Sequence, residues 1–268
     1  MTRGSQLSGI RTLVLSAVVL AAVCAYAGPK ETLAFADSCY KVRAVGAKGD
    51  KADRALADKM TSAYVSLIRD KTYGERAAVG AMQSVYFRIR FASQGDKDKF
   101  SLIKKAKLLG DTLHSLYPKN YEITGIYAAI YSMWGVNEGA LKSVKNGVAA
   151  RVRDLADSSG NYQVLGRTHQ LLPHIPIILS WPDKKLARKY LQLALDQHPE
   201  DLYNYFFLAE LYTDSKEYDK AESMIAQGLE RGVRPDFVLE DNRARWHMKE
   251  VQATIDKKRG KKKDKEKS

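Results

Sequence analysis

The chain carries few of the residue patterns that support catalysis or metal binding. It has no Gly-rich phosphate loop, no H-E-x-x-H or C-x-x-C metal pattern and no G-x-S-x-G nucleophile turn. His169 and His174 are five residues apart with a proline between them, so they do not share a helix face as paired metal ligands would. The other three histidines, at positions 114, 198 and 247, are isolated. We therefore expect no catalytic residue, no metal and no cofactor, and a protein that is not an enzyme.

Aromatic and arginine side chains offer better candidates for a ligand site. Three aromatic residues recur at helical spacing between positions 127 and 134, and the inner helices of a helical repeat line its concave face. Arginine pairs well with carboxylates, which is the chemistry that Arg88, Arg90 and Arg167 offer. Core packing and solvated helix faces would explain the same residues, so both interpretations stay open. The predicted ligand-binding residues are Tyr127, Tyr131, Trp134, Arg167 and Trp181.

Helices must position these residues, because the composition and the spacing of apolar residues both favour helix. The 268 residues are 45% hydrophobic and include only 18 Gly and 7 Pro, so few residues break helices. Apolar residues recur every three or four positions through most of the chain after residue 50, and none of it alternates convincingly with period two. The sequence predicts an all-α protein with helices over Ala52–Arg69, Glu75–Phe91, Asp96–Leu116, Asn120–Trp134, Glu138–Asp157, Asp183–Gln197, Leu202–Thr213, Lys216–Arg231 and Phe237–Ile255.

Residues 183–232 show the pattern of large and small residues that is typical of a tetratricopeptide repeat, a 34-residue helical hairpin. Two predicted second helices share the same spacing of small and aliphatic residues, although Val233 stands where the second would have its proline. An ordinary helical bundle is the alternative. The residues that define the repeat are Ala187, Leu191, Ala194, Pro199, Tyr205, Leu208, Ala209, Tyr212, Ala221, Ile225 and Gly228, and the best repeat spans 199–232.

A weaker copy of this pattern lies upstream. Ala106, Gly110, Leu113 and Pro118 repeat the same spacing, which indicates a decayed hairpin around residues 96–157. We therefore expect tetratricopeptide-repeat-like antiparallel helical hairpins that form a short solenoid.

An irregular segment from Gly166 to Lys185 interrupts the regular hairpins. Pro173, Pro176 and Pro182 break the helix expected there, and Trp181 stands beside the last of them. Because the segment is apolar, we expect it to pack into the concave side of the solenoid or against a partner.

The region from about 160 to 235 resembles the T-component (TatT-like) family of periplasmic proteins associated with TRAP transporters. The resemblance rests on a Gly- and Pro-containing loop, a helix with the motif D-K-x-x-A-x-x-x-L-x-x-A that begins at Asp183, a proline, and a helix in which the motif L-A-E-x-Y begins at Leu208. It implies a non-enzymatic helical protein that works with a periplasmic solute-binding subunit and holds or passes a small apolar organic anion. A general cell-envelope scaffold for protein–protein interaction is the alternative.

The N-terminus has the features of a secretory signal peptide. Basic residues precede an apolar run over 12–23, and an A-x-A site ends at Ala27, so we expect cleavage there and export to the periplasm of a Gram-negative bacterium. An uncleaved anchor and a lipoprotein signal at Cys24 are the alternatives. The run is shorter than the roughly 20 residues of a spanning helix, and Val23 stands where a lipoprotein signal has a small residue.

The C-terminal residues 257–268 carry eight basic and two acidic side chains, in a chain of formal net charge +13. We expect a disordered, solvated tail. Contact with anionic lipid or cell wall is the alternative, and it is favoured over nucleic acid because an exported protein meets little nucleic acid. The predicted organisation is a signal peptide over 1–27, an extended segment over 28–50, a helical domain over 51–256 and the basic tail over 257–268.

Overall fold

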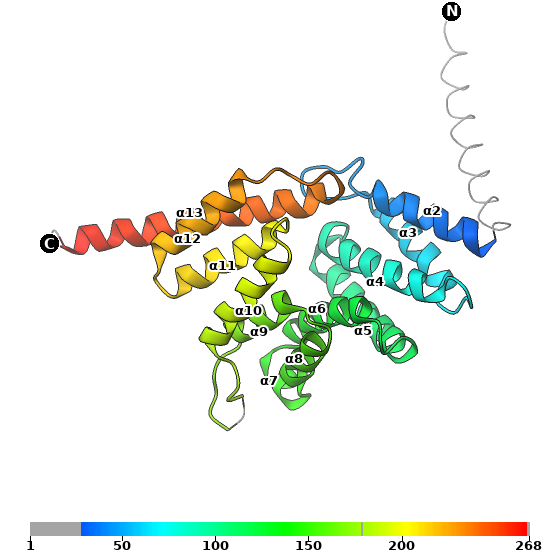
Figure 1. The fold of residues 1–268 in the computed structure, drawn as a ribbon, viewed down its shortest axis with the longest axis horizontal. Coiled ribbons are helices and arrows are strands. Elements are labelled where there is room, and N and C mark those ends of the chain that lie inside the picture. Colours follow the sequence, from blue (N-terminus) through cyan, green and yellow to red (C-terminus); the bar gives the residue numbers. More distant parts are fainter. Residues whose placement is uncertain (1–27, 178, 267–268) are drawn as a thin grey trace, which may run out of the picture.

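The computed structural model describes residues 28–177 and 179–266, which form antiparallel helical hairpins in a short, curved all-α solenoid (Figure 1). The predicted fold class is confirmed, and the predicted signal peptide lies outside the described residues. In chain order the helices are α2 (Pro29–Lys41), α3 (Arg54–Leu67), α4 (Gly74–Phe91), α5 (Gly95–Leu116), α6 (Tyr121–Glu138), α7 (Ala140–Lys145), α8 (Val148–Ser158), α9 (Tyr162–Leu171), α10 (Lys184–Gln197), α11 (Leu202–Asp214), α12 (Tyr218–Glu230), the short 3₁₀ helix η1 (Pro235–Phe237) and α13 (Val238–Glu266).

Side-chain caps fix where many of these helices begin. Asn120, Asn161 and Asp201 precede α6, α9 and α11, and each side chain accepts a hydrogen bond from a backbone N–H of the first turn. Asp53 and Asp183 do the same for α3 and α10. Such caps satisfy N–H groups that have no partner within the helix. The local sequence therefore sets the boundaries of the hairpins.

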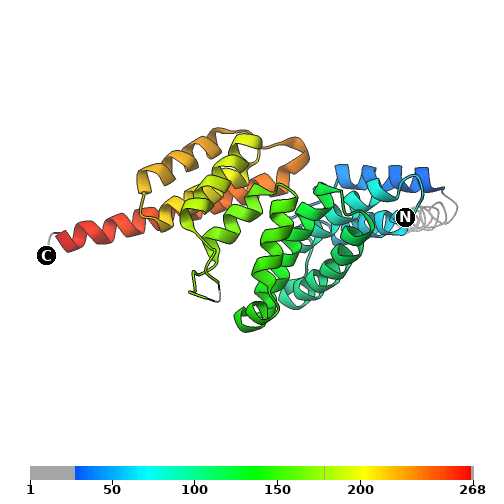
Figure 2. The same ribbon diagram turned by 60° about the horizontal axis from the view of Figure 1, so that its bottom comes forward.

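Two apolar cores lie along the solenoid, and α13 belongs to both. The first contains residues of α2 to α9, and the second contains residues of α10 to α13. Leu239, near the start of α13, is buried in the first core, whereas Met248 and Ile255 on the same helix are buried in the second. The last helix thus returns to the N-terminal half of the chain and bridges the two cores (Figures 1 and 2).

Glycines allow neighbouring helices to approach closely at two tyrosine contacts. A Cβ on Gly80 of α4 would lie 2.3 Å from the ring of Tyr64 on α3, and a Cβ on Gly110 of α5 would lie 2.2 Å from the ring of Tyr127 on α6. Each tyrosine hydroxyl donates a hydrogen bond to a nearby carboxylate. Burial, followed by this hydrogen bond, raises the pKa of both phenols. The small residue is therefore a steric requirement of both contacts.

The repeat-defining positions lie almost entirely inside the hairpins. Nine of the eleven are buried, while Tyr212 is half-buried and Pro199 is exposed in the turn before α11. Ala106, Gly110 and Leu113 of the weaker upstream pattern are buried as well. These residues therefore serve to pack one helix on the next.

The observed helices differ from the predicted ones at four places. Residues 29–41, expected to be extended, form α2, and the single helix predicted over Glu138–Asp157 is divided into α7 and α8 at Gly147, whose φ is +63°. Helix α9 was not predicted because its buried face includes Thr168 and His169, which weaken the apolar periodicity. Helix α13 continues to Glu266, so the basic tail begins within a helix.

The irregular segment was expected to pack into the concave side of the solenoid or against a partner, but its tip does not pack on the described chain. Its first residues belong to α9, and the loop that follows, up to Ile177, extends away from the helices (Figures 1 and 2). Ile177 at the tip is 99% exposed. Nearer α10, Leu179 and Pro182 are buried, so the loop is exposed at its tip and packed at its base.

Candidate functional site

Two arginines join the ends of the solenoid. Arg43, in the loop after α2, donates to the carboxylate of Glu240 at 3.0 Å and to the carbonyl oxygen of Asp236. Arg243 of α13 donates to the carboxylate of Asp50 at 2.8 Å and to the carbonyl oxygen of Arg90 at 2.6 Å. These contacts join residues 153 to 197 positions apart in the sequence and close the helical array on itself.

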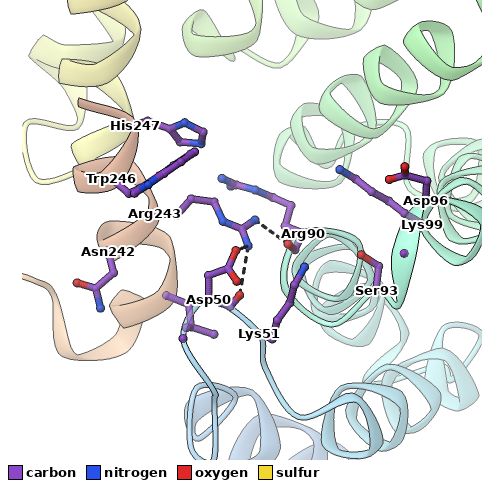
Figure 3. Close-up of a pocket in the computed structure, with 13 residues that line it drawn as sticks. Asp50, Lys51, Arg90, Ser93, Asp96, Lys99, Asn242, Arg243, Trp246 and His247 are labelled. Carbon is purple, nitrogen blue, oxygen red and sulfur yellow. Dashed lines mark hydrogen bonds and ion pairs between the residues drawn. The ribbon is translucent and has the colours of Figure 1, made fainter. Parts of the chain in front are cut away.

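A cleft of about 770 Å³ lies at this junction, and we call it the closure cleft (Figure 3). Its walls come from the loop around Lys51, from the end of α4 and the start of α5, and from α13. The lining side chains that carry its chemistry are Lys51, Arg90, Lys99, Arg243, Trp246 and His247.

The closure cleft has a surplus of positive charge. Lys51, Arg90, Lys99 and Arg243 are four cations that line it, against the two carboxylates of Asp50 and Asp96. Arg243 is paired with Asp50, but within residues 28–177 and 179–266 no ion pair or side-chain hydrogen bond engages Arg90. In Figure 3 the side chain of Arg90 reaches toward Trp246 and His247. A free guanidinium in a cleft is a ready partner for a carboxylate.

Aromatic rings hold the cationic side chain of Arg90 in place. Its guanidinium lies 4.4 Å from the ring centroid of Tyr203 and 5.3 Å from that of Tyr86. The hydroxyl of Tyr203 is buried and has no hydrogen-bond partner among the described residues, and burial raises the pKa of this phenol to about 12. Stacking of this kind stabilises a guanidinium without neutralising its charge, so Arg90 remains available to an anion.

Trp246 and His247 form the opposite wall of the closure cleft. Trp246 is 56% exposed, although it is the largest apolar side chain on α13. His247 stacks on Phe206 of α11 with centroids 4.8 Å apart, and burial, followed by the charges of Arg243 and Arg90, lowers its pKa. The wall is therefore aromatic and uncharged at neutral pH.

The predicted aromatic site lies elsewhere, at the interface between α5 and α6. Tyr127, Tyr131 and Trp134 are brought together there, with successive ring centroids 5.6 and 5.2 Å apart. The ammonium of Lys107 lies over the rings of Tyr131 and Trp134, and Tyr127 is 1% exposed. None of the three lines either of the two described pockets. Packing between helices accounts for their positions.

The other two predicted ligand residues are separate from this group and from each other. Arg167 pairs with Glu210 and stacks over Phe207 at 4.3 Å. Arg88, also considered for a carboxylate ligand, pairs with Asp58. Of the three arginines considered from the sequence, only Arg90 keeps an unpaired guanidinium. The aromatic wall was missed because its residues lie on a helix about 150 positions further along the chain.

Trp181 anchors the base of the exposed loop. Its ring contacts His169 with centroids 5.1 Å apart, and Arg153 stacks over it at 4.8 Å. The Nδ1 of His169 accepts a hydrogen bond from the backbone N–H of Asp183 at 3.1 Å. This bond requires an imidazole that is unprotonated at Nδ1, so it depends on pH.

We predict that His169 makes the stability of the protein fall in mild acid. Burial, partly opposed by Asp183 and reinforced by Arg153, lowers the pKa of this imidazole below 6.5 in the folded state. The unfolded chain then binds more protons, so the stabilisation is present above about pH 6.5 and is lost as the pH falls through the folded-state pKa. Urea unfolding at pH 7.5 and 5.5 would measure this loss. His169→Gln, whose amide oxygen can accept the same bond without titrating, should lose less stability between the two pH values; equal losses would contradict the prediction.

A second, smaller pocket of about 340 Å³ lies near the start of α6, α9 and α11. The polar side chains at its centre already form hydrogen bonds within the chain. Gln163 donates to Asn204 at 2.8 Å, and Asn204 donates to the carbonyl oxygens of Ala194 and His198. This pocket therefore offers a ligand fewer free polar groups than the closure cleft.

The described residues also bear on metal binding and on membrane insertion. Across 28–177 and 179–266, no group of three or more His, Cys, Asp or Glu side chains is placed to hold a metal ion. Within the same ranges, no helix combines the length and the apolar composition that a membrane span needs.

Comparison with known families supports the repeat. Residues 185–237, which cover α10 to η1, match the family described as Tetratricopeptide repeat. No curated protein matches the chain. The likeness to tetratricopeptide repeats therefore has support beyond the spacing of residues, whereas the resemblance to T-component proteins stays a prediction.

Proposed function

We propose that this protein is an exported, non-enzymatic scaffold that binds a partner protein in the closure cleft. Helical repeats of the tetratricopeptide type are typically protein-binding modules that use extended concave surfaces. The observation that carries the proposal is that one open cleft is lined both by the guanidinium of Arg90, which forms no ion pair, and by the exposed indole of Trp246. Arginine and tryptophan are the residue types that most often dominate binding energy at protein interfaces.

The transport role implied by the T-component resemblance is the second candidate. It calls for an enclosed apolar cavity that holds an organic anion, and a solute-binding subunit as partner. The closure cleft is open and is lined by charged as well as aromatic side chains. This arrangement favours a scaffold for a protein segment, and a solute-binding subunit is one form that the partner could take.

Export is part of the proposal and rests on the sequence of residues 1–27. Mass spectrometry of the mature protein should find Gly28 as its first residue. An intact N-terminus or a lipid on Cys24 would contradict cleavage after Ala27.

Photo-crosslinking in cells tests the proposed binding surface. A photoreactive phenylalanine in place of Trp246 should capture a partner protein, because this position faces the closure cleft and is exposed. Tyr121 is the matched control, since it is also aromatic, is 66% exposed and lies outside this cleft. Capture from position 121 but not from position 246 would place the partner elsewhere and overturn the proposal.

A further inference from the structure

Arg90 is an exception among the arginines of this chain. Arg43 and Arg88 are buried, and Arg234 is half-buried like Arg90. Arg43, Arg88 and Arg234 each form an ion pair with a carboxylate. Among the arginines of residues 28–177 and 179–266 that are not exposed, Arg90 is the one whose side chain makes neither an ion pair nor a hydrogen bond. Removing a guanidinium from water without a partner is unfavourable. The missing partner is therefore best sought outside the chain.

The surroundings of Arg90 favour an anion. Lys51 and Lys99 enter the same cleft, and no ion pair within the described chain engages either of them. Of the two carboxylates that line the cleft, Asp50 is held by Arg243 and Asp96 is exposed in the first turn of α5. Three cations thus remain unpaired, and their fields add within a partly enclosed space.

The two walls of the cleft suit different parts of a ligand, one charged and one apolar. The three unpaired cations come from the N-terminal half of the chain, and the aromatic wall of Trp246 and His247 comes from α13. A ligand that fills the cleft must therefore combine negative charge with apolar surface. The volume of about 770 Å³ suits a short extended segment of a protein rather than a nucleic-acid duplex.

We infer that the closure cleft binds an acidic segment of the partner protein, with a carboxylate of that segment paired to Arg90 and its apolar side chains against Trp246. This inference rests on the proposed function and names the chemistry of the partner. Because the two walls belong to opposite ends of the solenoid, the segment binds the closed array more tightly than an opened one. By linkage, its binding stabilises the closure that Arg43 and Arg243 maintain.

A defined peptide tests this chemistry directly. A fluorescein-labelled decapeptide that alternates Glu with Leu should bind the full mature chain, and binding should weaken as salt is raised. The same peptide with Gln in place of Glu should bind at least about tenfold more weakly. A single-stranded oligothymidine of ten nucleotides serves as a competitor of different class. The inference would be overturned if the Glu and Gln peptides bound equally well, or if the oligonucleotide bound and the Glu peptide did not.

Substitutions assign the effect to the cleft. Arg90→Gln should weaken binding of the Glu peptide at least about tenfold, while Arg76→Gln, an exposed arginine outside the cleft, should leave it unchanged. Lys99→Gln removes an exposed cation whose side chain makes no ion pair or hydrogen bond with the described residues, so the variant should fold normally and still weaken binding about threefold. Arg243→Met leaves all three unpaired cations in place and should weaken binding by loosening the closure. If none of the three cleft variants differs from Arg76→Gln, the inference is wrong.

The crosslinking experiment separates this inference from the proposed function. Crosslinking from position 246 can be compared between the wild-type chain and Arg90→Gln. If both capture the same amount of partner, the scaffold role stands and recognition of an acidic segment is refuted. Absence of capture in both backgrounds would instead remove the proposed function itself.

Discussion

Replacing Arg43 by Met is expected to destabilise the protein by about 3 to 5 kcal/mol. The guanidinium of Arg43 is 3% exposed, and it pairs with Glu240 while also donating to two backbone carbonyl oxygens, those of Tyr40 and Asp236. Its removal leaves the carboxylate of Glu240, whose side chain is 15% exposed, without its partner. Urea unfolding would measure the loss, and hydrogen exchange in residues 42–53 should rise because the loop loses its link to α13.

Two further variants show whether this loss arises from the buried pair. Arg76→Met removes an ion pair with Asp37 whose side chains are 52% and 40% exposed, so it should cost less than about 1 kcal/mol. The double variant Arg43→Met with Glu240→Gln should recover part of the loss, because no buried charge is then left unpaired. An Arg43→Met protein as stable as Arg76→Met would show that the contact does not hold the two ends together.

Replacing Gly110 by Val is expected to destabilise the protein by about 3 kcal/mol. A Cβ at this position would lie 2.2 Å from Cδ2 of Tyr127. The ring cannot move aside easily, because it is 1% exposed, its hydroxyl donates to Asp111 and it packs against Tyr131. Helices α5 and α6 would therefore have to separate. Thermal unfolding would report the effect as a lower Tm.

The matched control for this variant is Gly260→Val. Gly260 is exposed on α13, and a Cβ added there would meet no atom within 4 Å, so this change should alter stability by only a few tenths of a kcal/mol. Removing the obstructing ring tests the cause. In a Tyr127→Leu background, Gly110→Val should cost much less than in the wild-type chain. An unchanged cost would mean that the clash with Tyr127 is not responsible.

The closure of the array gives the binding site its composition. The contacts of Arg43 and Arg243, together with the burial of Leu239 in the first core, hold the cations around Arg90 opposite the aromatic wall of α13. Changes that stabilise or break the closure should therefore change binding as well as stability. The loop that carries Ile177 lies outside this arrangement, and its contribution to binding can be tested independently.

The sequence alone determined most of the helices and their pairing into hairpins. Helix formation depends on caps such as Asn120 and on apolar residues three or four positions apart, and hairpin packing depends on small residues such as Gly110; all of these can be read within a few tens of residues. The helix predictions that were wrong also have local causes. Helix α9 buries Thr168 and His169, so its apolar stripe is weak, and the break at Gly147 depends on a single left-handed residue.

Only the tertiary structure decided which charged and aromatic residues form a site. The sequence identified Arg90 as one of three arginines that could bind a carboxylate, but it could not show that Arg88 and Arg167 already have partners on other helices. Nor could it place Trp246 opposite Arg90, because they are 156 positions apart. Periodicity reports which face of a helix is buried, whereas the meeting of distant faces depends on the summed curvature of every hairpin between them.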